Sequence, residues 1–283
     1  MAKRKNPEQL TPEESRKIIG NKLSFGAAEA YKLLRTNLTF SLPDTDGCKI
    51  IGVTSALRGE GKSTTSINMA YTIAQTGQKV LLVEGDLRLP TMAKRLRVAS
   101  KPGLSNLLAG QATEHDAIQP SRLIDNFWVI TAGDTPPNPA ELLESKQMYS
   151  QLKRFTSAFD VIIIDLPPVN VVSDALIVSK MVNGIVLVVR QDYCDKGSLD
   201  GAVHQLQFVD AKILGFVLSG SDYQEKSYRH YGHYKKSHYG SYHYGYGSYD
   251  GTEPASKKEL KAAEKAEKKA KKAADKEAKK ASR

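Results

Sequence analysis

The segment ALRGEGKST, residues 56–64, has the residue types and the A/G-x-x-x-x-G-K-S spacing of a phosphate-binding loop. Gly59 and Gly61 would let backbone N–H groups turn toward a phosphate, and a helix N-terminus behind the loop would favour that anion. Lys62 would reach the β- and γ-phosphates, and the Ser63 hydroxyl would hold Mg²⁺. The candidate nucleotide-binding residues are Gly59, Glu60, Gly61, Lys62, Ser63 and Thr64.

The surroundings of this loop favour a nucleotide site over an ordinary glycine-rich turn. The apolar run 48–56 predicts a strand that leads into the loop, and KSTTSINMAYTIAQTG predicts a helix that follows it. A phosphate-binding loop requires this strand–loop–helix context. We therefore expect a bound nucleotide with magnesium.

Two further apolar runs end on carboxylates. VIIIDLPP ends on Asp165, which could support the magnesium shell through water, and VLLVEGDLR ends on Glu84 and Asp86. Any one of the three could be only a helix cap or a turn former. Together, at the carboxyl ends of two strands in a sheet that already has a phosphate loop, they favour a site, because ligands of open α/β sheets bind at that edge.

The elements that must position these residues follow a βαβ pattern. We expect strands over 48–56, 79–86, 126–133, 160–167, 184–191 and 212–220, with helical spacing between most of them and in 26–40. Short continuous apolar runs are typical of a mostly parallel sheet with helices on both faces. The sequence thus predicts one α/β domain over 24–220, preceded by a mobile arm over 1–23.

Composition excludes several other classes. Of the formal charge of +10, residues 252–283 carry +6 and residues 221–251 carry +1, so the first 220 residues carry only +3 and do not resemble a nucleic-acid-binding surface. Cys48 and Cys194 are too few for a disulfide framework or a zinc site, which fits a reducing cytosol. The polar start and the short apolar runs predict neither a secretory signal nor a membrane span.

The segment 221–251 holds nine of the thirteen tyrosines and almost no aliphatic side chain. Such a composition predicts disorder, because burial cannot offset the entropy lost on ordering, and it leaves the tyrosine hydroxyls open to an enzyme. A low-complexity adhesive segment, a base-stacking segment and an idle linker are the alternatives. The candidate acceptors are Tyr223, Tyr228, Tyr231, Tyr234, Tyr239, Tyr242, Tyr244, Tyr246 and Tyr249.

The last segment, 252–283, consists of strong helix formers with Glu–Lys pairs at i, i+4. Leu260 is its only large apolar residue, so we expect a solvated spacer, helical or disordered, rather than an amphipathic membrane helix. Electrostatic contact with anionic lipid is left open.

The motifs GEGKST, LLVEGDLR and VIIIDLPP, with GDTPPNPAELL between them and a tyrosine cluster after them, resemble the bacterial tyrosine kinases (BY-kinases) of capsule and exopolysaccharide synthesis. The resemblance covers roughly residues 26–249 and is greatest to the Firmicute type, a cytoplasmic kinase with a separate membrane activator. It implies a P-loop NTPase fold of the MinD/ParA-like type and ATP with Mg²⁺ as cofactors. It also implies that the protein is an autokinase that phosphorylates its own tyrosine cluster between subunits.

The resemblance also implies roles for single residues. Lys62 and Ser63 correspond to the Walker A phosphate and metal residues, Asp165 to the Walker B carboxylate, and Asp86 to a third metal or catalytic group. Walker A′ normally reads Asp-x-Asp, whereas Glu84 stands first here, so the catalytic base is open between Glu84 and Asp86. We expect all four charged groups, Lys62, Glu84, Asp86 and Asp165, to be catalytic.

Assembly and partners are implied in the same way. EAYKLLR resembles the oligomerisation motif Glu-x-x-Arg-x-x-Arg, which assigns Glu29, Lys32 and Arg35 to a ring contact; a solvated helix face is the alternative. The expected partners are the cytoplasmic segment of a membrane activator or chain-length regulator, a cognate phosphotyrosine phosphatase and other copies of the chain, but no nucleic acid. The expected location is the cytoplasm, at the inner face of the plasma membrane.

A positioning ATPase of the MinD/ParA type is the rival interpretation. Those ATPases share the fold and the three motifs, but carry a signature lysine five residues before the invariant one, where this chain has Leu57. They also have no use for a tyrosine cluster. A nucleic-acid-binding module is the third interpretation, and the nearly neutral domain disfavours it.

Overall fold

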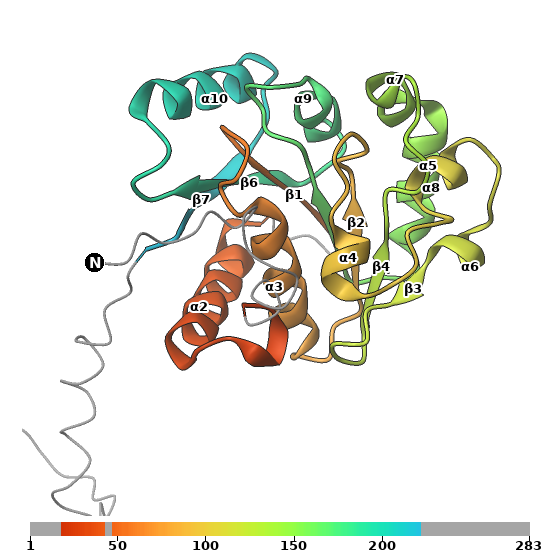
Figure 1. Cartoon of the computed structure of the whole chain (residues 1–283), viewed down its shortest axis with the longest axis horizontal. Helices are drawn as coiled ribbons and strands as arrows, with labels where there is room; N and C mark the ends of the chain where they lie inside the picture. The colour runs from red at the N-terminus through yellow and green to blue at the C-terminus, as the bar shows by residue number, and fades with distance from the viewer. Residues whose placement is uncertain (1–17, 43–46, 222–283) are drawn as a thin grey trace, which may run out of the picture. The chain divides into compact units, whose positions relative to one another are not determined.

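The structure is a computed structural model that describes residues 18–42 and 47–221 (Figure 1). In this part of the chain seven strands form one sheet in the order β3-β4-β2-β5-β1-β6-β7. All neighbouring strands are parallel except β3 and β4, which confirms the predicted mostly parallel α/β sheet. The strands are β1 Lys49–Ser55, β2 Val80–Glu84, β3 Gln119–Pro120, β4 Phe127–Ile130, β5 Val161–Asp165, β6 Gly184–Arg190 and β7 Ile213–Ser219.

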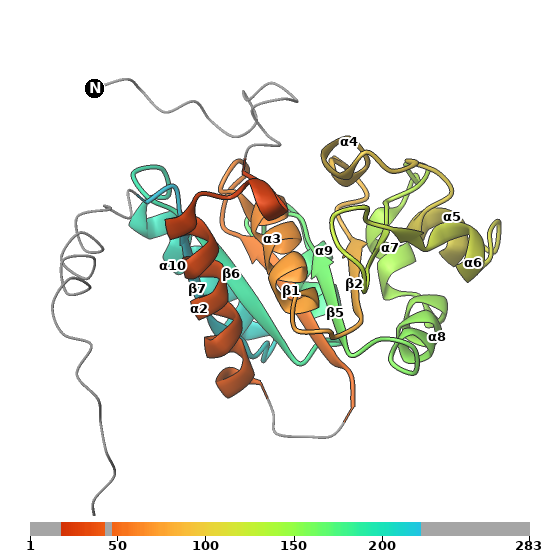
Figure 2. The same ribbon diagram turned by 90° about the horizontal axis from the view of Figure 1, so that it is seen from below.

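Helices cover both faces of the sheet (Figures 1 and 2). Side chains of α2, α3 and α4 pack on one face, and side chains of α5 to α10 pack on the other. The helices are η2 Gly20–Lys22 (a 3₁₀ helix), α2 Phe25–Ser41, α3 Lys62–Ala74, α4 Met92–Leu96, α5 Leu104–Leu108, α6 Glu114–Ala117, α7 Pro139–Glu144, α8 Lys146–Phe155, α9 Asp174–Ser179 and α10 Lys196–Phe208.

The apolar core lies on the two faces of the central strands. In β5, Ile162 and Ile164 belong to the core under α5 to α10, whereas Val161 and Ile163 belong to the core under α2 to α4. Every residue of β2 and β5 is buried. This two-sided burial explains why the strands appear in the sequence as continuous apolar runs.

The N-terminal boundary of the domain differs from the sequence-based expectation. Residues 18–23 were assigned to a mobile arm, but Ile19 is 4% exposed and belongs to the core. Asn68 of α3 fixes the backbone here: its amide oxygen accepts from the Gly20 N–H at 2.9 Å and its amide nitrogen donates to the Ile18 carbonyl at 2.9 Å. Asn68 lies 48 to 50 residues away in the sequence, so no local pattern in residues 18–23 indicates these two hydrogen bonds. The boundary is therefore corrected, and the domain includes residues 18–23.

The predictions for residues 1–17 and 222–283 lie outside the described residues. These include the tyrosine-rich segment and the lysine-rich segment. The two-residue strand β3, antiparallel to β4, was not predicted; it is too short to show a pattern of its own.

Candidate active site

The phosphate-binding loop connects β1 to α3 at the carboxyl edge of the sheet (Figure 2). Gly59 has φ +78° and Gly61 has φ +93°, conformations that favour glycine. A Cβ atom on Gly61 would lie 3.3 Å from the Ser219 hydroxyl oxygen, so the loop also lacks room for a side chain there. Lys62 is the first residue of α3, and the loop thus ends at a helix N-terminus, where an anion is favoured.

Glu60 holds the loop in shape from inside. Its side chain is buried and accepts from the Leu57 N–H at 2.6 Å and from the Arg190 N–H at 3.3 Å. The Arg190 guanidinium donates to the Gly59 carbonyl at 3.1 Å, and the Ser219 hydroxyl donates to the Glu60 carbonyl. Arg190 and Ser219 end β6 and β7, and neither was singled out in the sequence, although their places at strand ends are the signal that identified the carboxylates.

Asp165 lies at the end of β5 and is 1% exposed. It accepts from the Ser66 hydroxyl at 3.0 Å and from the Ser63 hydroxyl, both on α3. Burial raises the pKa of Asp165, and the positive charge of Lys62 together with the two hydroxyls opposes that rise. The structure therefore brings Ser63 and Asp165 together, as the motifs predicted.

Lys62 and Asp86 form an ion pair across the same edge, with 3.2 Å between Nζ and Oδ2. The other carboxylate oxygen of Asp86 accepts from the Leu89 N–H at 3.1 Å, so the turn after β2 fixes its orientation. Both side chains are mostly buried. The structure therefore brings Lys62 and Asp86 together at the carboxyl edge of the sheet.

Glu84 has a different setting from Asp86. It is 1% exposed and accepts three backbone N–H groups: Thr91 and Met92 on one oxygen, with Met92 at 2.8 Å, and Ala132 on the other at 3.0 Å. Burial raises the pKa of Glu84 to about 7, against the lowering effect of the three donors. Glu84 thereby ties the loop after β2 to the start of α4 and to the end of β4.

Two arginines near the site were not predicted. The Arg88 guanidinium donates two hydrogen bonds to Asp174, from Nε to Oδ2 at 3.0 Å and from Nη2 to Oδ1 at 3.1 Å. Asp174 is fully buried at the start of α9. Arg95 of α4 donates to the Thr64 hydroxyl at 3.1 Å, beside the phosphate loop. These contacts connect α4 and α9 to the site. The motif LLVEGDLR contains Arg88, but its partner Asp174 lies 86 residues away and could not be identified from the motif.

The residues present fit ATP with magnesium. Gly59 and Gly61 take left-handed backbone conformations that turn the loop at the N-terminus of α3, where a phosphate is favoured, and Lys62 lies there to meet phosphate oxygens. A serine hydroxyl and carboxylates are oxygen donors, the ligands that Mg²⁺ prefers. Ser63 and Asp165 are therefore the residues that would hold the metal, with Asp86 next to them.

The three residues of the expected ring contact lie on α2. Lys32 pairs with Glu29 at 2.7 Å on the surface. Arg35 instead donates to the Thr72 carbonyl of α3 at 2.8 Å, within its own chain. The structure thus uses Arg35 in an internal contact, while Glu29 and Lys32 form a surface ion pair; it contains one chain and does not test the ring.

Fold and loop together define a P-loop nucleotide-binding protein. The family model described as AAA domain matches residues 48–213, more than half of the chain. The septum site-determining protein MinD of Pyrococcus horikoshii OT3, solved in complex with Mg-ADP, is similar with a TM-score of 0.52 and 25% identity over 60% of this chain and 70% of that one. This comparison confirms the MinD-like P-loop fold.

The nearer comparisons give the family. Tyrosine-protein kinase YwqD of Bacillus subtilis (strain 168) is 37% identical over 207 residues, which cover 73% of this chain and 86% of that protein. The kinase domain of the Escherichia coli tyrosine kinase ETK is similar with a TM-score of 0.66 and 33% identity over 78% of this chain and 80% of that one. The chain belongs to the bacterial tyrosine-protein kinases. The predicted enzyme class is confirmed, and the kinase is favoured over the rival positioning ATPase.

Within residues 18–42 and 47–221, no helix is both long and apolar enough to cross a bilayer.

Proposed function

We propose that the protein transfers the γ-phosphoryl group of ATP to tyrosines of its own segment 223–249, with the acceptor supplied by a neighbouring subunit. The observation that carries the proposal is the convergence of Lys62, Asp86 and Asp165 at the end of three adjacent parallel strands, beside a phosphate loop. Phosphoryl transfer asks a protein mainly for positioning and charge stabilisation. These residues supply both.

The residues divide the work by their surroundings. ATP, bound with magnesium, supplies the phosphoryl group. Lys62 would stabilise the charge of the β- and γ-phosphates, while Ser63 and Asp165 would hold the metal. Asp86 would take the phenolic proton as the tyrosine oxygen forms its bond to the γ-phosphorus and the bond to the β-phosphate oxygen breaks; the products are phosphotyrosine and ADP.

The choice of Asp86 as the base rests on its contacts. One Asp86 oxygen pairs with the flexible amine of Lys62, which can move to phosphate and leave that oxygen to a phenol. Both oxygens of Glu84 are taken by backbone N–H groups that cannot move without the loop. We therefore assign Glu84 to the positioning of the loop that carries Asp86.

The acceptor segment explains a cluster of tyrosines in a chain region with few apolar side chains. Each phosphotyrosine adds a charge of about −1.5 to −2, and several of them repel neighbouring subunits. The negative charge of the segment would then grow with each phosphoryl transfer. This charge would loosen an assembly held through Glu29, Lys32 and Arg35. Solvent-exposed Tyr149 and Tyr193 of the domain are the alternative acceptors.

The proposed setting is the regulation of capsular or exopolysaccharide synthesis and export. The resemblance of the motifs and the kinship to bacterial tyrosine-protein kinases support it. The chain would be cytoplasmic and recruited to the inner face of the plasma membrane by the cytoplasmic segment of a membrane activator. A cognate phosphotyrosine phosphatase would reset it.

The test mixes two full-domain proteins. The Lys62→Met chain, inactive but with an intact acceptor segment, is incubated with ATP, Mg²⁺ and an active chain truncated after Ser221. Phosphotyrosine on the Lys62→Met chain means transfer between subunits. Absence of label there, with both proteins folded and associated by light scattering and with label appearing on the active full-length chain, would refute transfer between subunits.

A further inference from the structure

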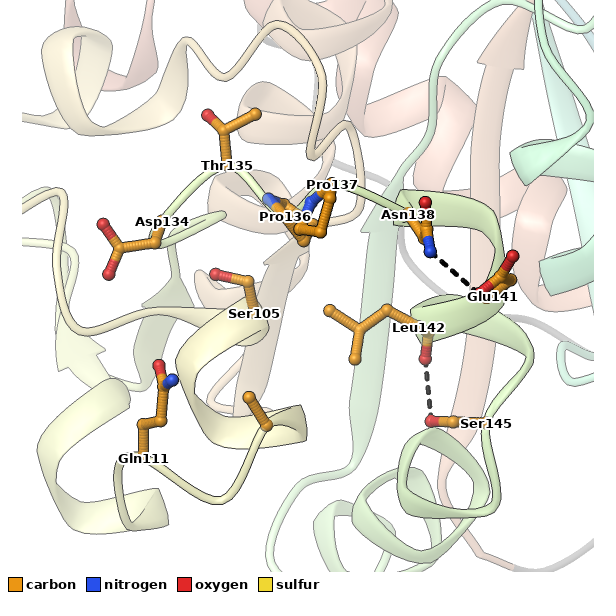
Figure 3. A pocket seen from close by; sticks show the side chains of 11 residues that line it. Ser105, Gln111, Asp134, Thr135, Pro136, Pro137, Asn138, Glu141, Leu142 and Ser145 are labelled. Atoms are coloured by element: carbon orange, nitrogen blue, oxygen red, sulfur yellow. Dashed lines mark hydrogen bonds between the residues drawn. The ribbon is translucent and has the colours of Figure 1, made fainter.

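A second concave site lies at the same edge of the sheet as the phosphate loop, in the region that follows β4. It is a pocket of about 480 Å³ between α5, the loop 134–138 and α7 (Figure 3). A pocket of this size is large enough for an aromatic side chain with its neighbouring backbone. Its walls include Ser105, Asp134, Pro136, Pro137, Glu141 and Leu142.

The lining combines apolar surface with negative charge. Two prolines and Leu142 supply the apolar wall, and Asp134 and Glu141 supply carboxylates. Asp134 is ion-paired with Lys101, so Glu141, which accepts from the Asn138 amide, carries most of the negative charge that an occupant would meet. Lys101 and Asn106 hold the pKa of Asp134 below its usual range, so that carboxylate is ionised. An occupant with an aromatic ring and nearby positive charge fits such a wall, and an anionic ligand does not.

Ser105 adds a specific polar group. Its side chain projects from α5 into the ring of lining residues (Figure 3), the residue is 4% exposed, and its hydroxyl oxygen has no hydrogen-bond partner among the described residues. Because that oxygen is itself buried, a phenolic O–H would meet it after the Ser105 side chain turns toward the pocket, and the contact would satisfy a hydroxyl that is costly to leave without a partner.

The chain itself contains an occupant with these properties. Residues 223–249 hold nine tyrosines together with four Lys or Arg and four His, against Glu225 as the one acidic residue in that range. The described part of the chain ends at Ser221, just after β7, and a chain of 28 residues spans at most about 95 Å. The segment can therefore reach the pocket of its own or of a neighbouring copy.

The spacing of the tyrosines is compatible with the spacing of the strands that lead into the two sites. The loop 134–138 follows β4, Asp86 follows the adjacent strand β2, and Lys62 follows β1, three places from β4. At about 4.8 Å per strand, the strand ends that lead into the two sites are about 5 to 14 Å apart along the sheet edge. Consecutive tyrosines lie two to five residues apart, which spans about 7 to 17 Å of extended chain.

We propose that this pocket docks one tyrosine of the segment 223–249 while the next tyrosine occupies the catalytic site. The proposal rests on the proposed autophosphorylation and adds its acceptor-binding site. Docking would hold the segment near the active site between transfers, so that one encounter leads to several phosphotyrosines. Phosphorylation of the docked tyrosine would weaken its binding beside Asp134 and Glu141 and release the segment.

The transfer experiment uses the full chain with its nine acceptor tyrosines replaced by serine as the enzyme, and the full Lys62→Met chain as the acceptor. Glu141→Lys reverses a charge in the pocket, and Glu144→Lys makes the same change on α7 outside it; Ala109→Phe fills the pocket without changing charge. We expect acceptor phosphorylation to be about five- to tenfold slower with Glu141→Lys and Ala109→Phe. Glu144→Lys should equal the parent, and all should bind ATP alike.

A binding experiment separates this proposal from the proposed function. The labelled peptide KSYRHYGHYKKSHY, residues 226–239, is titrated into the same tyrosine-to-serine chain and into its Glu141→Lys and Glu144→Lys forms. Binding that falls only with Glu141→Lys supports docking even when no transfer is seen, in which case only the kinase proposal fails. Equal peptide binding and equal transfer rates in Glu141→Lys and Glu144→Lys overturn docking. Docking is also overturned if Glu141→Lys slows the labelling of an unrelated protein substrate but does not slow the labelling of segment 223–249.

Discussion

Replacing Glu84 with glutamine tests whether this residue is a positioning group or the catalytic base. Glutamine keeps the size and one carbonyl acceptor, but its amide nitrogen cannot accept the Ala132 N–H that Glu84 accepts at 3.0 Å. One buried donor then loses its partner, which costs about 1–3 kcal/mol. At pH 5 the free energy of unfolding of Glu84→Gln should be lower than that of the parent by about this amount.

The difference should change with pH in a defined direction. Burial raises the pKa of Glu84 from 4.5 to about 7, so between these pH values the folded chain holds a proton that the unfolded chain has released. The stabilisation that this proton gives is complete below pH 4.5 and is lost as the pH rises through 7. This loss lowers the free energy of unfolding of the parent by about 3 kcal/mol between low and high pH. The Glu84→Gln chain does not lose this stabilisation, because glutamine does not titrate.

Urea denaturation of both chains at pH values from 5 to 8, without nucleotide, measures this difference. The advantage of the parent should shrink with rising pH and vanish or reverse near pH 8. An advantage that grows with pH would contradict the reasoning, since it would mean that the three N–H donors outweigh burial. Kinase turnover of Glu84→Gln should stay within about tenfold of the parent, while Asp86→Asn should lose about a hundredfold or more; a reversed order would make Glu84 the base.

Three further predictions concern the loop, the metal and the assembly. Gly61→Ala puts a Cβ atom 3.3 Å from the Ser219 hydroxyl oxygen on a residue in the left-handed conformation, so it should lower the free energy of unfolding by about 1–2 kcal/mol. It should also weaken ATP binding in titration calorimetry. Unchanged affinity would contradict the role of Gly61 in phosphate binding. Asp165→Asn should sharply reduce magnesium-dependent tyrosine phosphorylation while melting no lower than the parent, because it removes a buried charge; retained activity would remove Asp165 from the metal site. Glu29→Ala should reduce both oligomer mass in light scattering and labelling of the acceptor segment with little change in melting temperature, because its ion pair with Lys32 lies at the surface. A parent that is monomeric at every concentration, with the activator segment present, would refute the ring.

Periodicity and strand-end logic predicted the sheet and the convergence of Lys62, Asp86 and Asp165. Continuous apolar runs predict buried parallel strands, and such strands end at one edge, so residues after them must meet there. Arg190 and Ser219 end β6 and β7, so their positions at strand ends also predict that they lie at this edge, although the sequence analysis did not name them. They support the loop through hydrogen bonds to the carbonyls of Gly59 and Glu60.

Other contacts had no signal in the sequence because they depend on side chains that reach distant backbone. Glu84 looks like a second catalytic carboxylate in the motif, but its role depends on N–H groups of Thr91, Met92 and Ala132, which only the fold brings to it. Residues 18–23 look like an extension of a polar arm, yet Asn68 binds their backbone. Hydrogen bonds of this kind follow from tertiary structure and not from a period or a motif.

Mapping of phosphotyrosine by mass spectrometry shows directly whether segment 223–249 is the acceptor. The full chain and its Lys62→Met form are each purified, dephosphorylated, and incubated with ATP and Mg²⁺. We expect phosphate on several tyrosines between Tyr223 and Tyr249 in the parent and none in Lys62→Met. A parent that carries no phosphotyrosine in that segment, or carries it mainly on Tyr149 or Tyr193 of the domain, would refute phosphorylation of the segment as the function of the site.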